Sequence, residues 1–356
     1  MYSSPPAGPA KLPCVIRAMI EDKLFRFTRD LVDMDSTTER EGPVARCVAD
    51  FLRREAGGAL EVELWPVAAG EPDRFNVFAR CGHPDVVLST HLDTVPPFIP
   101  SREDATAIYG RGACDAKGIV AAQVFAALEL LASGRRDFGL LFVAGEERNS
   151  AGAAAANLRP QGARFLINGE PTESRIISAG KGALRLDLRA HGRAAHSAYP
   201  ELGDSAIDKL LLALARIRAL DLPSDPELGP TTINIGTLTG GRAPNVIADQ
   251  ASAELLIRLV TPAQDLRARI QAAVAGAAEA EFVLEIPPIR LRTVPGFPTA
   301  IVAFGTDIPK LDAWGEPLLY GPGSIQVAHT EGEFIAKAEL AAAVAAYARL
   351  VAHLQQ

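Results

Sequence analysis

The sequence predicts an α/β protein with a mixed sheet covered by helices, together with a second, smaller α+β module. Three observations predict this class. Continuously apolar strand-like segments alternate with apolar helical segments near both ends of the chain. The middle of the chain changes to alternating apolar and polar residues. The length of 356 residues suits two domains, because a domain commonly has about 150 residues.

Composition excludes several classes of protein. Hydrophobic residues make up 48% of the chain and charged residues 22%, so the chain can bury a sizeable core and is not disordered. Lys and Arg number 36 against 43 Asp and Glu, for a formal charge of −7. This balance argues against a nucleic-acid partner, which would require a basic face. No apolar run approaches the roughly 18 residues of a membrane span, so we expect no membrane partner either.

The cysteines and the N-terminus indicate a cytoplasmic protein. The four cysteines are scattered and form no C-x-x-C pair, which is typical of reduced thiols; they are Cys14, Cys47, Cys81 and Cys114. The first residues have no basic region followed by an apolar core. We therefore predict a Pro-rich N-terminal tail that is not a signal peptide, and a cytoplasmic location.

The first third of the chain predicts two helices followed by short strands. Apolar residues recur at helical spacing between Met19 and Glu55, and the polar residues 33–42 divide this stretch into two helices. Strand-like runs follow at residues 62–65 and 76–79, punctuated by Pro, Gly and Asp.

Three continuous apolar runs then predict strands that are buried on both faces. They cover residues 85–91, 138–145 and 164–169. Between them, residues 118–132 are apolar nearly all round, which indicates a buried helix, and residues 150–158 form an Ala-rich helix. The sheet in this part of the chain is therefore parallel or mixed and lies between helices.

From about Ala183 the sequence predicts a second module. Its strands cover residues 183–191, 231–239, 251–260 and 282–286, and its helices residues 204–220 and 261–278. The second helix opens with a Thr-Pro pair, which commonly starts a helix. This β-α-β-β-α-β order over about 105 residues is the ferredoxin-like arrangement. Its sheet has open edges, so we expect two copies of the chain to form a dimer through this module.

The C-terminal part returns to the α/β pattern. Residues 291–305 predict a short strand, residues 318–323 lead into a loop, and residues 331–356 form a long helix. The second module is therefore inserted. We predict a discontinuous first domain of residues 1–181 and 289–356, and an inserted domain of residues 182–288.

Acidic and imidazole side chains follow the ends of the predicted strands. His91 and Asp93 follow the first buried strand, Glu146 and Glu147 the second and Glu170 the third, while Asp115 lies in a loop between the first two; they are six candidate functional residues. Ligands of α/β sheets bind outside the carboxyl ends of the strands. Charged residues are rarely buried unless they are paired or bind metal. Imidazole and carboxylate groups fit zinc, and a carboxylate can bridge two metal ions.

Two further roles suit this set. The spare carboxylate of the Glu146–Glu147 pair can act as a general base toward water. Asp93 lies two residues from His91 and can fix the tautomer of that imidazole.

In these residues and in the motifs around them, the chain resembles the dinuclear zinc aminoacylases and exopeptidases. This family includes acetylornithine deacetylase, succinyl-diaminopimelate desuccinylase, aminoacylase and glutamate carboxypeptidase. The resemblance runs from about Ile20 to the C-terminus and rests on the order and spacing of several motifs. They are THLDTVP, GRGACDAKG, GEER, GEPT, GRAAHSAYPELGDSAI, GGRAPNVIAD and GPGSIQVAHTEGE. It implies a zinc-exopeptidase-like first domain, with the inserted module as a lid and dimerisation domain.

The resemblance also implies residue roles. Two Zn²⁺ ions per subunit, which Co²⁺ can replace, would be held by His91 with Glu170 and by Glu147 with His329, with Asp115 as the bridge. Glu146 would be the general base, and Asp93 would orient His91.

The lid residues of the family have counterparts here as well. His196 would reach across the dimer to stabilise the oxyanion, and Asn245 and Arg258 would hold the substrate carboxylate. Gly323, in the GPGS motif before His329, resembles a substrate-binding position and favours acetylornithine deacetylase. This subfamily would act on a small N-acyl amino acid and would belong to arginine biosynthesis.

Other interpretations remain open at this point. A desuccinylase, a dipeptidase or a carboxypeptidase of the same family fits the same motifs, and so does a metal-binding protein without activity. Arg258 could simply pair with Glu254 on the same strand. Cys114 could be proposed as a nucleophile, but the neighbouring carboxylates would raise its pKa rather than activate it.

Overall fold

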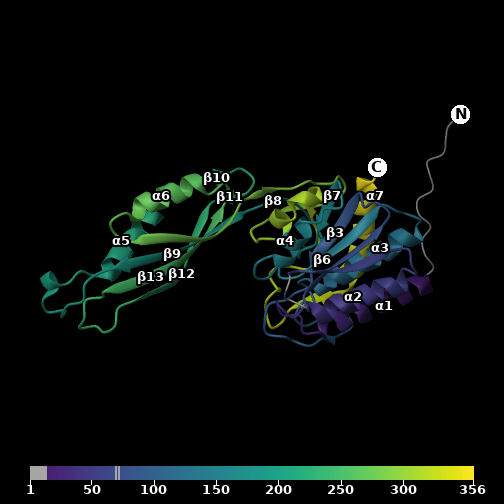
Figure 1. Ribbon diagram of the computed structural model, residues 1–356, viewed down its shortest axis with the longest axis horizontal. Coiled ribbons are helices and arrows are strands. Elements are labelled where there is room, and N and C mark those ends of the chain that lie inside the picture. Colours follow the sequence, from purple (N-terminus) through teal and green to yellow (C-terminus); the bar gives the residue numbers. More distant parts are fainter. Residues whose placement is uncertain (1–13, 69, 71–72) are drawn as a thin grey trace. The chain divides into compact units, whose positions relative to one another are not determined.

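The structure, a computed structural model, describes residues 14–68, 70 and 73–356, so the predicted Pro-rich tail lies outside the described residues. The chain divides into two compact units. The first comprises residues up to 176, 292–299 and 306–356, and the second comprises residues 177–291 and 300–305 (Figure 1). For comparison, the sequence predicts residues 182–288 as the inserted module. Each unit has its own core, so the two are described separately.

The first unit is built around a six-stranded mixed sheet, in the order β1-β2-β6-β3-β7-β17. Its strands are β1 (Glu61–Pro66), β2 (Phe75–Cys81), β3 (Val86–His91), β6 (Phe138–Val143), β7 (Phe165–Asn168) and β17 (Glu316–Leu319). The last four strands are parallel, whereas β1 and β2 are antiparallel to their neighbours. All residues of β3, β6 and β7 are buried, as their continuous apolar runs predict.

Helices cover both faces of this sheet, which confirms the predicted class. The helices are α1 (Cys14–Val32), α2 (Gly42–Glu55), α3 (Lys117–Ala132), α4 (Ala151–Asn157) and α7 (Lys337–Leu354). Helices α1, α2, α3 and α7 share one large core with the sheet. On the other face, α4 and two 3₁₀ turns, Ile308–Lys310 and Asp312–Trp314, pack around a cluster that contains Trp65 and Trp314.

The second unit is a four-stranded antiparallel sheet, in the order β12-β13-β9-β14, with two helices on one face (Figure 1). Its elements are β9 (Gly182–His191), α5 (Ala206–Arg218), β12 (Thr232–Gly240), β13 (Gln250–Leu259), α6 (Gln264–Val274) and β14 (Glu279–Ile286). The alternating apolar residues of β9 and β13 face the helices and form the core of this unit. Their other residues form a polar face, on which Arg185 pairs with Glu254 and Arg189 with Glu281.

Short strands complete the two units. The segments at the start and the end of the second unit form a three-stranded sheet of β8 (Ile176–Gly180), β15 (Ile289–Arg290) and β16 (Thr299–Val302). The first unit also contains a sheet of β4 (Arg102–Glu103), β5 (Ala107–Tyr109) and β18 (Phe334–Ala336), and the second unit contains the pair β10 (Ser224–Asp225) and β11 (Gly229–Pro230). A 3₁₀ turn, Pro200–Leu202, precedes α5. These short strands lack a strong sequence pattern, and β16 is the one among them that the sequence predicts.

Two predicted helix starts are wrong. The C-terminal helix begins at Lys337 rather than residue 331, because Phe334–Ala336 pair with β5. Helix α6 begins at Gln264, and its first backbone hydrogen bond runs from Arg267 to the carbonyl of Ala263. The Thr-Pro pair at residues 261–262 therefore lies before the helix instead of capping it.

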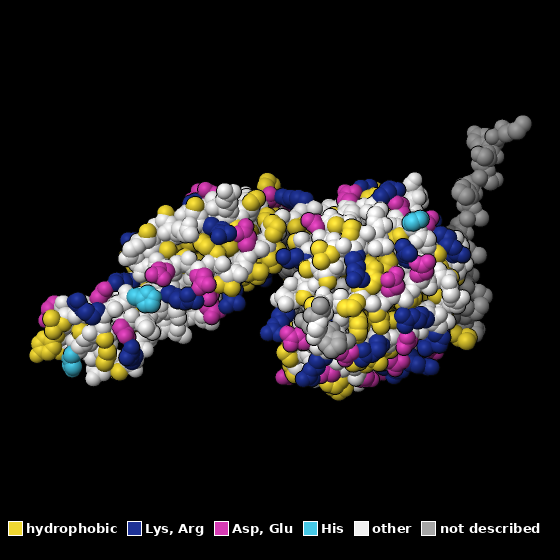
Figure 2. Space-filling view, viewed as in Figure 1, with side chains coloured by type: hydrophobic (Ala, Val, Ile, Leu, Met, Phe, Trp, Pro, Cys, Tyr) yellow, Lys and Arg dark blue, Asp and Glu magenta, His cyan; other side chains and the backbone are white. Residues whose placement is uncertain are grey.

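The visible surfaces carry no single sign of charge. Figure 2 shows Lys and Arg interspersed with Asp and Glu on the visible face of each unit. Within the described residues, no helix combines the length and the apolar character needed to cross a membrane.

A close contact between α4 and the end of β6 gives a test of the fold. Gly152 donates its N–H to Ala144, and Asn76 bonds both Ala144 and Gly152. A Cβ atom on Gly152 would lie 2.4 Å from the backbone of Ala144.

Gly152→Ala should therefore lower the free energy of unfolding by about 1–3 kcal/mol, because the added methyl group meets backbone atoms that cannot move aside. Urea denaturation measures this loss. The matched control is Gly236→Ala, where an added Cβ meets nothing closer than 3.6 Å and the backbone has no positive φ. Equal unfolding midpoints for the two variants would show that the packing around Gly152 is wrong.

Candidate metal centre

The four parallel strands of the first unit bring their carboxyl ends to the same edge of the sheet. His91 is the last residue of β3, Glu147 follows β6, Glu170 follows β7, and His329 lies in the loop after β17. Asp115 reaches the same place from the loop before α3. The structure therefore brings together all five residues predicted to bind metal.

Asp115 lies between the two histidines. Its Oδ1 is 3.0 Å from Nε2 of His91, and its Oδ2 is 3.3 Å from Nε2 of His329. Nε2 of His329 is also 3.0 Å from Oε1 of Glu147, and Nε2 of His91 is 4.0 Å from Oε2 of Glu170. Each oxygen of one carboxylate thus faces a different group of ligand atoms, which is the arrangement that a bridging ligand of two metal ions requires.

The surrounding carboxylates favour the charged forms of both imidazoles. Burial disfavours a charge on His91, but the hydrogen bonds with Asp115 and Asp93 outweigh it and hold the pKa of His91 well above its usual value. Hydrogen bonds with Asp115 and Glu147 raise the pKa of His329 to about 10. Although burial acts in the opposite direction, hydrogen bonds with His329 and His91 lower the pKa of Asp115.

This chemistry fits a pair of divalent cations. Each Nε2 lies beside carboxylate oxygens, so a cation next to it would be surrounded by imidazole nitrogen and carboxylate oxygen, the ligands typical of zinc sites. Oε1 of Glu170 is buried and has no hydrogen-bond partner among the described residues, so it is a free ligand atom. His91, Asp115 and Glu147 each place a ligand atom within 4.8 Å of the others.

The tautomer of His91 is fixed by the backbone. Nδ1 of His91 lies 2.9 Å from the carbonyl oxygen of Asp93, which can only accept a hydrogen bond. Nδ1 therefore carries a proton, and Nε2 is left for the ligand side of the ring. The carboxylate of Asp93 is farther from this nitrogen, at 3.6 Å.

The carboxylate of Asp93 is instead occupied by the next strand-end loop. Its Oδ1 accepts hydrogen bonds from the backbone N–H groups of Gly145 and Glu146, and its Oδ2 accepts from Glu147 and from the hydroxyl of Thr38. The loop that carries the predicted base and one predicted ligand is thus tied to the loop that carries His91. Asp93 acts on both loops.

Glu146 lies among several carboxylates. Burial raises its pKa well above the usual value, and the negative charges of Asp307, Glu147 and Asp115 raise it further. Both effects favour the neutral form of this side chain more than in an exposed glutamate. Bound cations would favour the carboxylate, which is the form that a general base requires.

Asp307 is a member of this cluster that the sequence pattern does not reveal. It follows β16, is 1% exposed, and its carboxylate lies near the side chain of Ser150. Burial raises its pKa to about 6; the hydrogen bond with Ser150 and the charge of His91 act in the opposite direction, and the charges of Asp93 and Glu147 add to the effect of burial. A lone Asp after a short strand gives no periodic signal, so only the folded chain shows its position.

Gly323 packs closely against Cys114, the residue that precedes Asp115. Gly323 has φ of +85°, and a Cβ atom there would lie 2.4 Å from Sγ of Cys114. The glycine is therefore required by packing, and its predicted contact with substrate stays a prediction. Burial, together with the charges of Asp115 and Glu333, raises the pKa of Cys114 well above its usual value, which disfavours a role as a nucleophile.

In the second unit, His196 and Asn245 lie together at one end of the sheet. Residues 196 and 246 form an isolated β-bridge, and the carbonyl oxygen of Asn245 accepts a hydrogen bond from the N–H of Ser197. Both side chains belong to exposed residues. The structure therefore brings these two predicted residues together on a surface.

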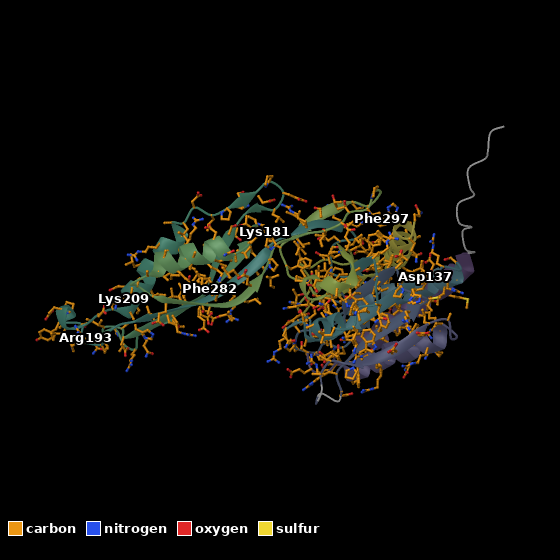
Figure 3. The ribbon with its side chains drawn as sticks, turned by 45° about the horizontal axis from the view of Figure 1, so that its top comes forward. Asp137, Lys181, Arg193, Lys209, Phe282 and Phe297 are labelled. Carbon is orange, nitrogen blue, oxygen red and sulfur yellow. The ribbon has the colours of Figure 1, made fainter. Side chains whose placement is uncertain are left out.

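Arg258 lies at the opposite end of the same sheet. Gln250 pairs with His191 near the His196 loop, whereas Arg258 pairs with Ala183 at the other end of β9. Eight residues of extended strand span about 26 Å. In Figure 3, the labels of Arg193 and Lys181 mark the two opposite ends of this sheet. Asn245 and Arg258 of one chain therefore do not hold the same carboxylate within this unit. The partner of Glu254 is Arg185.

Comparison with known proteins agrees with this architecture. The model of "Peptidase family M20/M25/M40" matches residues 87–353. A "probable carboxypeptidase" of Aspergillus clavatus is 42% identical and covers 92% of this chain and 82% of its own length. A peptidase M20 domain-containing protein of Schizosaccharomyces pombe is 38% identical and covers 93% of this chain and 84% of its own length.

Solved structures show the same fold at low sequence identity. The aminopeptidase PepT from Bacillus cereus superposes with a TM-score of 0.79 at 20% identity and covers 94% of this chain and 99% of its own. A metallo-carboxypeptidase of the M20 family from Sulfolobus solfataricus gives a TM-score of 0.69 at 14% identity, with 94% and 99% coverage. The family match spans most of the chain and includes all five predicted ligands. The chain therefore belongs to peptidase family M20/M25/M40.

Proposed function

We propose that this metal-dependent hydrolase is a carboxypeptidase or dipeptidase. It would cleave the amide bond before a C-terminal amino acid whose carboxylate is free. The observation that carries hydrolysis at a dinuclear metal site is the placement of Asp115, which presents one oxygen to His91 and the other to His329. The class of substrate is supported by relatives named carboxypeptidase that match more than nine-tenths of the chain.

The comparisons favour this proposal over the acetylornithine deacetylase that the sequence alone suggests. The reported relatives carry neither that name nor a role in arginine biosynthesis. Deacylation of a small N-acyl amino acid is the second candidate, since the bond cleaved has the same chemistry and the GPGSIQVAH segment resembles that subfamily.

In the proposed reaction, His91, Glu170, Glu147 and His329 would hold two Zn²⁺ ions, or Co²⁺ as a substitute, with Asp115 between them. When bound, such ions polarise the carbonyl group of the substrate and lower the pKa of the attacking water. Glu146 would take a proton from this water and deliver it to the leaving amine nitrogen. Asp93 would keep Glu146 in place through the backbone N–H groups of its loop.

The residues of the second unit would serve two different sites. Because Arg258 and Asn245 lie at opposite ends of the lid sheet, we propose a homodimer through this unit. His196 and Asn245 would act at the partner's metal centre, where His196 would stabilise the oxyanion. Arg258 would bind the substrate carboxylate at the centre of its own chain. A cytoplasmic location remains our expectation.

A panel of substrates tests the proposed specificity. Dipeptides and N-acyl amino acids with a free C-terminal carboxylate should be cleaved, and the same compounds as C-terminal amides should react about 10- to 100-fold more slowly, because they lack the charged group that Arg258 would bind. Release of amino acid after loading with Zn²⁺ is the measurement, and a chelator should abolish it. Preference for N-acetylornithine would replace the proposal with its second candidate, and equal cleavage of the amides would contradict carboxylate recognition.

Substitution of Glu146 tests the general base. Glu146→Gln should lower kcat by about 10²- to 10⁴-fold, since the amide cannot take a proton from water. The metal content and the melting temperature should stay close to those of the wild type. Glu129→Gln, at the far end of α3, is the control and should leave kcat unchanged. Activity retained by Glu146→Gln would exclude Glu146 as the base.

Mixed dimers test the sharing of residues between subunits. His196→Ala and Glu146→Gln should each be inactive, because each removes one residue from every site. A purified heterodimer of the two should recover about half of the wild-type activity, since one of its two sites is then complete. A protein that is monomeric in solution, or a heterodimer without recovered activity, would contradict the proposed sharing.

A further inference from the structure

Glu333 forms a buried clamp on the loop that carries Asp115. The residue is 1% exposed, and it lies just before β18. Its Oε1 accepts hydrogen bonds from the backbone N–H groups of Gly112, Cys114 and Asp115, at 2.9, 3.2 and 3.1 Å. Its Oε2 accepts a hydrogen bond from Nη1 of Arg111 at 2.6 Å. One carboxylate therefore meets four donors, and one of them is the N–H of the predicted bridging ligand itself.

Arg111 extends this clamp to two other loops. It is 2% exposed, its Nε donates to the carbonyl oxygen of Pro97 at 3.3 Å, and its Nη1 also donates to that of Thr330 at 3.2 Å. Pro97 belongs to the loop that follows His91, and Thr330 follows His329 directly. A single ion pair thus joins the three segments that carry His91, Asp115 and His329.

The backbone at His329 gives this connection a particular importance. His329 has φ of +64°, in the left-handed region that residues other than glycine rarely adopt. Such a conformation persists only when neighbouring contacts hold it. Thr330 makes two contacts of this kind. Its carbonyl oxygen accepts a hydrogen bond from Arg111, and its hydroxyl donates one to the carbonyl oxygen of Val327 at 2.7 Å.

A purely structural role for the pair is the competing interpretation. Buried ion pairs are weak evidence for stability, because well-packed apolar residues often replace them without loss. Four donors aimed at one carboxylate beside predicted metal ligands are better explained by a need to fix the geometry of those ligands.

We propose that the Arg111–Glu333 pair is a positioning device, which holds Asp115 and His329 at the separation that the second metal ion requires. Neither residue would touch substrate or metal. The proposal rests on the metal centre of the proposed function but not on its substrate, so it is tested by metal binding alone, and failure of the substrate panel would leave this test unaffected.

The experiment is a titration of the metal-free protein with Co²⁺, followed by calorimetry and by visible absorption. Wild-type protein should bind two ions per chain. Glu333→Gln keeps the size of the side chain but places an N–H₂ group against either the backbone donors or Arg111. It should weaken the lower of the two Co²⁺ affinities by about 10- to 100-fold and change the absorption of the second ion.

Two further variants separate positioning from general stability. Arg111→Lys keeps the charge but has one compact donor group in place of the planar fork that reaches Pro97, Thr330 and Glu333. It should weaken the second Co²⁺ in the same direction, and it carries the test if Glu333→Gln does not fold. Asp225→Asn is the matched control in the second unit, because Asp225 likewise accepts two backbone N–H groups and one arginine, from Glu227, Leu228 and Arg290. It should lower the melting temperature without changing either affinity.

Wild-type Co²⁺ affinities and absorption in the folded Glu333→Gln and Arg111→Lys variants would overturn the proposal, whatever their melting temperatures. An equal loss of affinity in Asp225→Asn would overturn it as well, since the effect would then follow stability rather than the position of the ligands.

Discussion

The interaction on which the rest of the structure depends is the contact of one buried carboxylate, that of Asp115, with two imidazoles. Asp115 is 5% exposed, Glu170 and Asp307 are also buried nearby, and the side chain of the half-buried Glu147 is 7% exposed. So many negative charges in one place are costly unless cations offset them. The carboxylates also favour the charged forms of His91 and His329, whose positive charges offset part of this cost. The parallel strands and the clamped loops hold these groups together despite their mutual repulsion.

The sequence predicts the part of this centre that depends on regular elements. Buried strands have continuous apolar runs, their carboxyl ends meet at one edge, and residues placed after them must converge, as His91 and Glu170 do. Family motifs supply His329, which no periodicity would select. The alternation in β9 and β13 similarly indicates which residues face the helices of the second unit.

The remainder depends on contacts between segments far apart in the chain. The sequence pattern places Glu333 in the predicted C-terminal helix, whereas the pairing of β18 with β5 shows that this residue lies before the helix. Asp307 becomes a neighbour of Glu146 only through the fold. Asp93 illustrates a subtler limit, because its spacing from His91 correctly suggests proximity but does not reveal that its carboxylate holds the Glu146–Glu147 loop. A short spacing along the chain can indicate that two groups lie close together, but not which hydrogen-bond donors each group contacts.

The distance between the two ends of the sheet of the second unit shows that the predicted substrate-binding residues of one chain do not form a single group. A residue set that resembles one substrate-binding group in the sequence is divided by the length of β13 in space. The same residues are consistent with a dimer in which Arg258 of one chain and Asn245 of the other would belong to one site. Sequence motifs alone do not distinguish these arrangements, since they carry the order of residues and not their separation.

The insertion of the second unit between the two parts of the first also fixes the order in which the centre can form on the ribosome. His91, Asp115, Glu147 and Glu170 are synthesised before the inserted unit, and His329 and Glu333 after it. At typical translation rates of about 5–20 residues per second, roughly 10–30 seconds separate these two events. During that interval the emerging chain has its acidic ligands but neither the second imidazole nor the clamp on Asp115. The full set of predicted ligands is therefore complete only after the inserted unit has been synthesised.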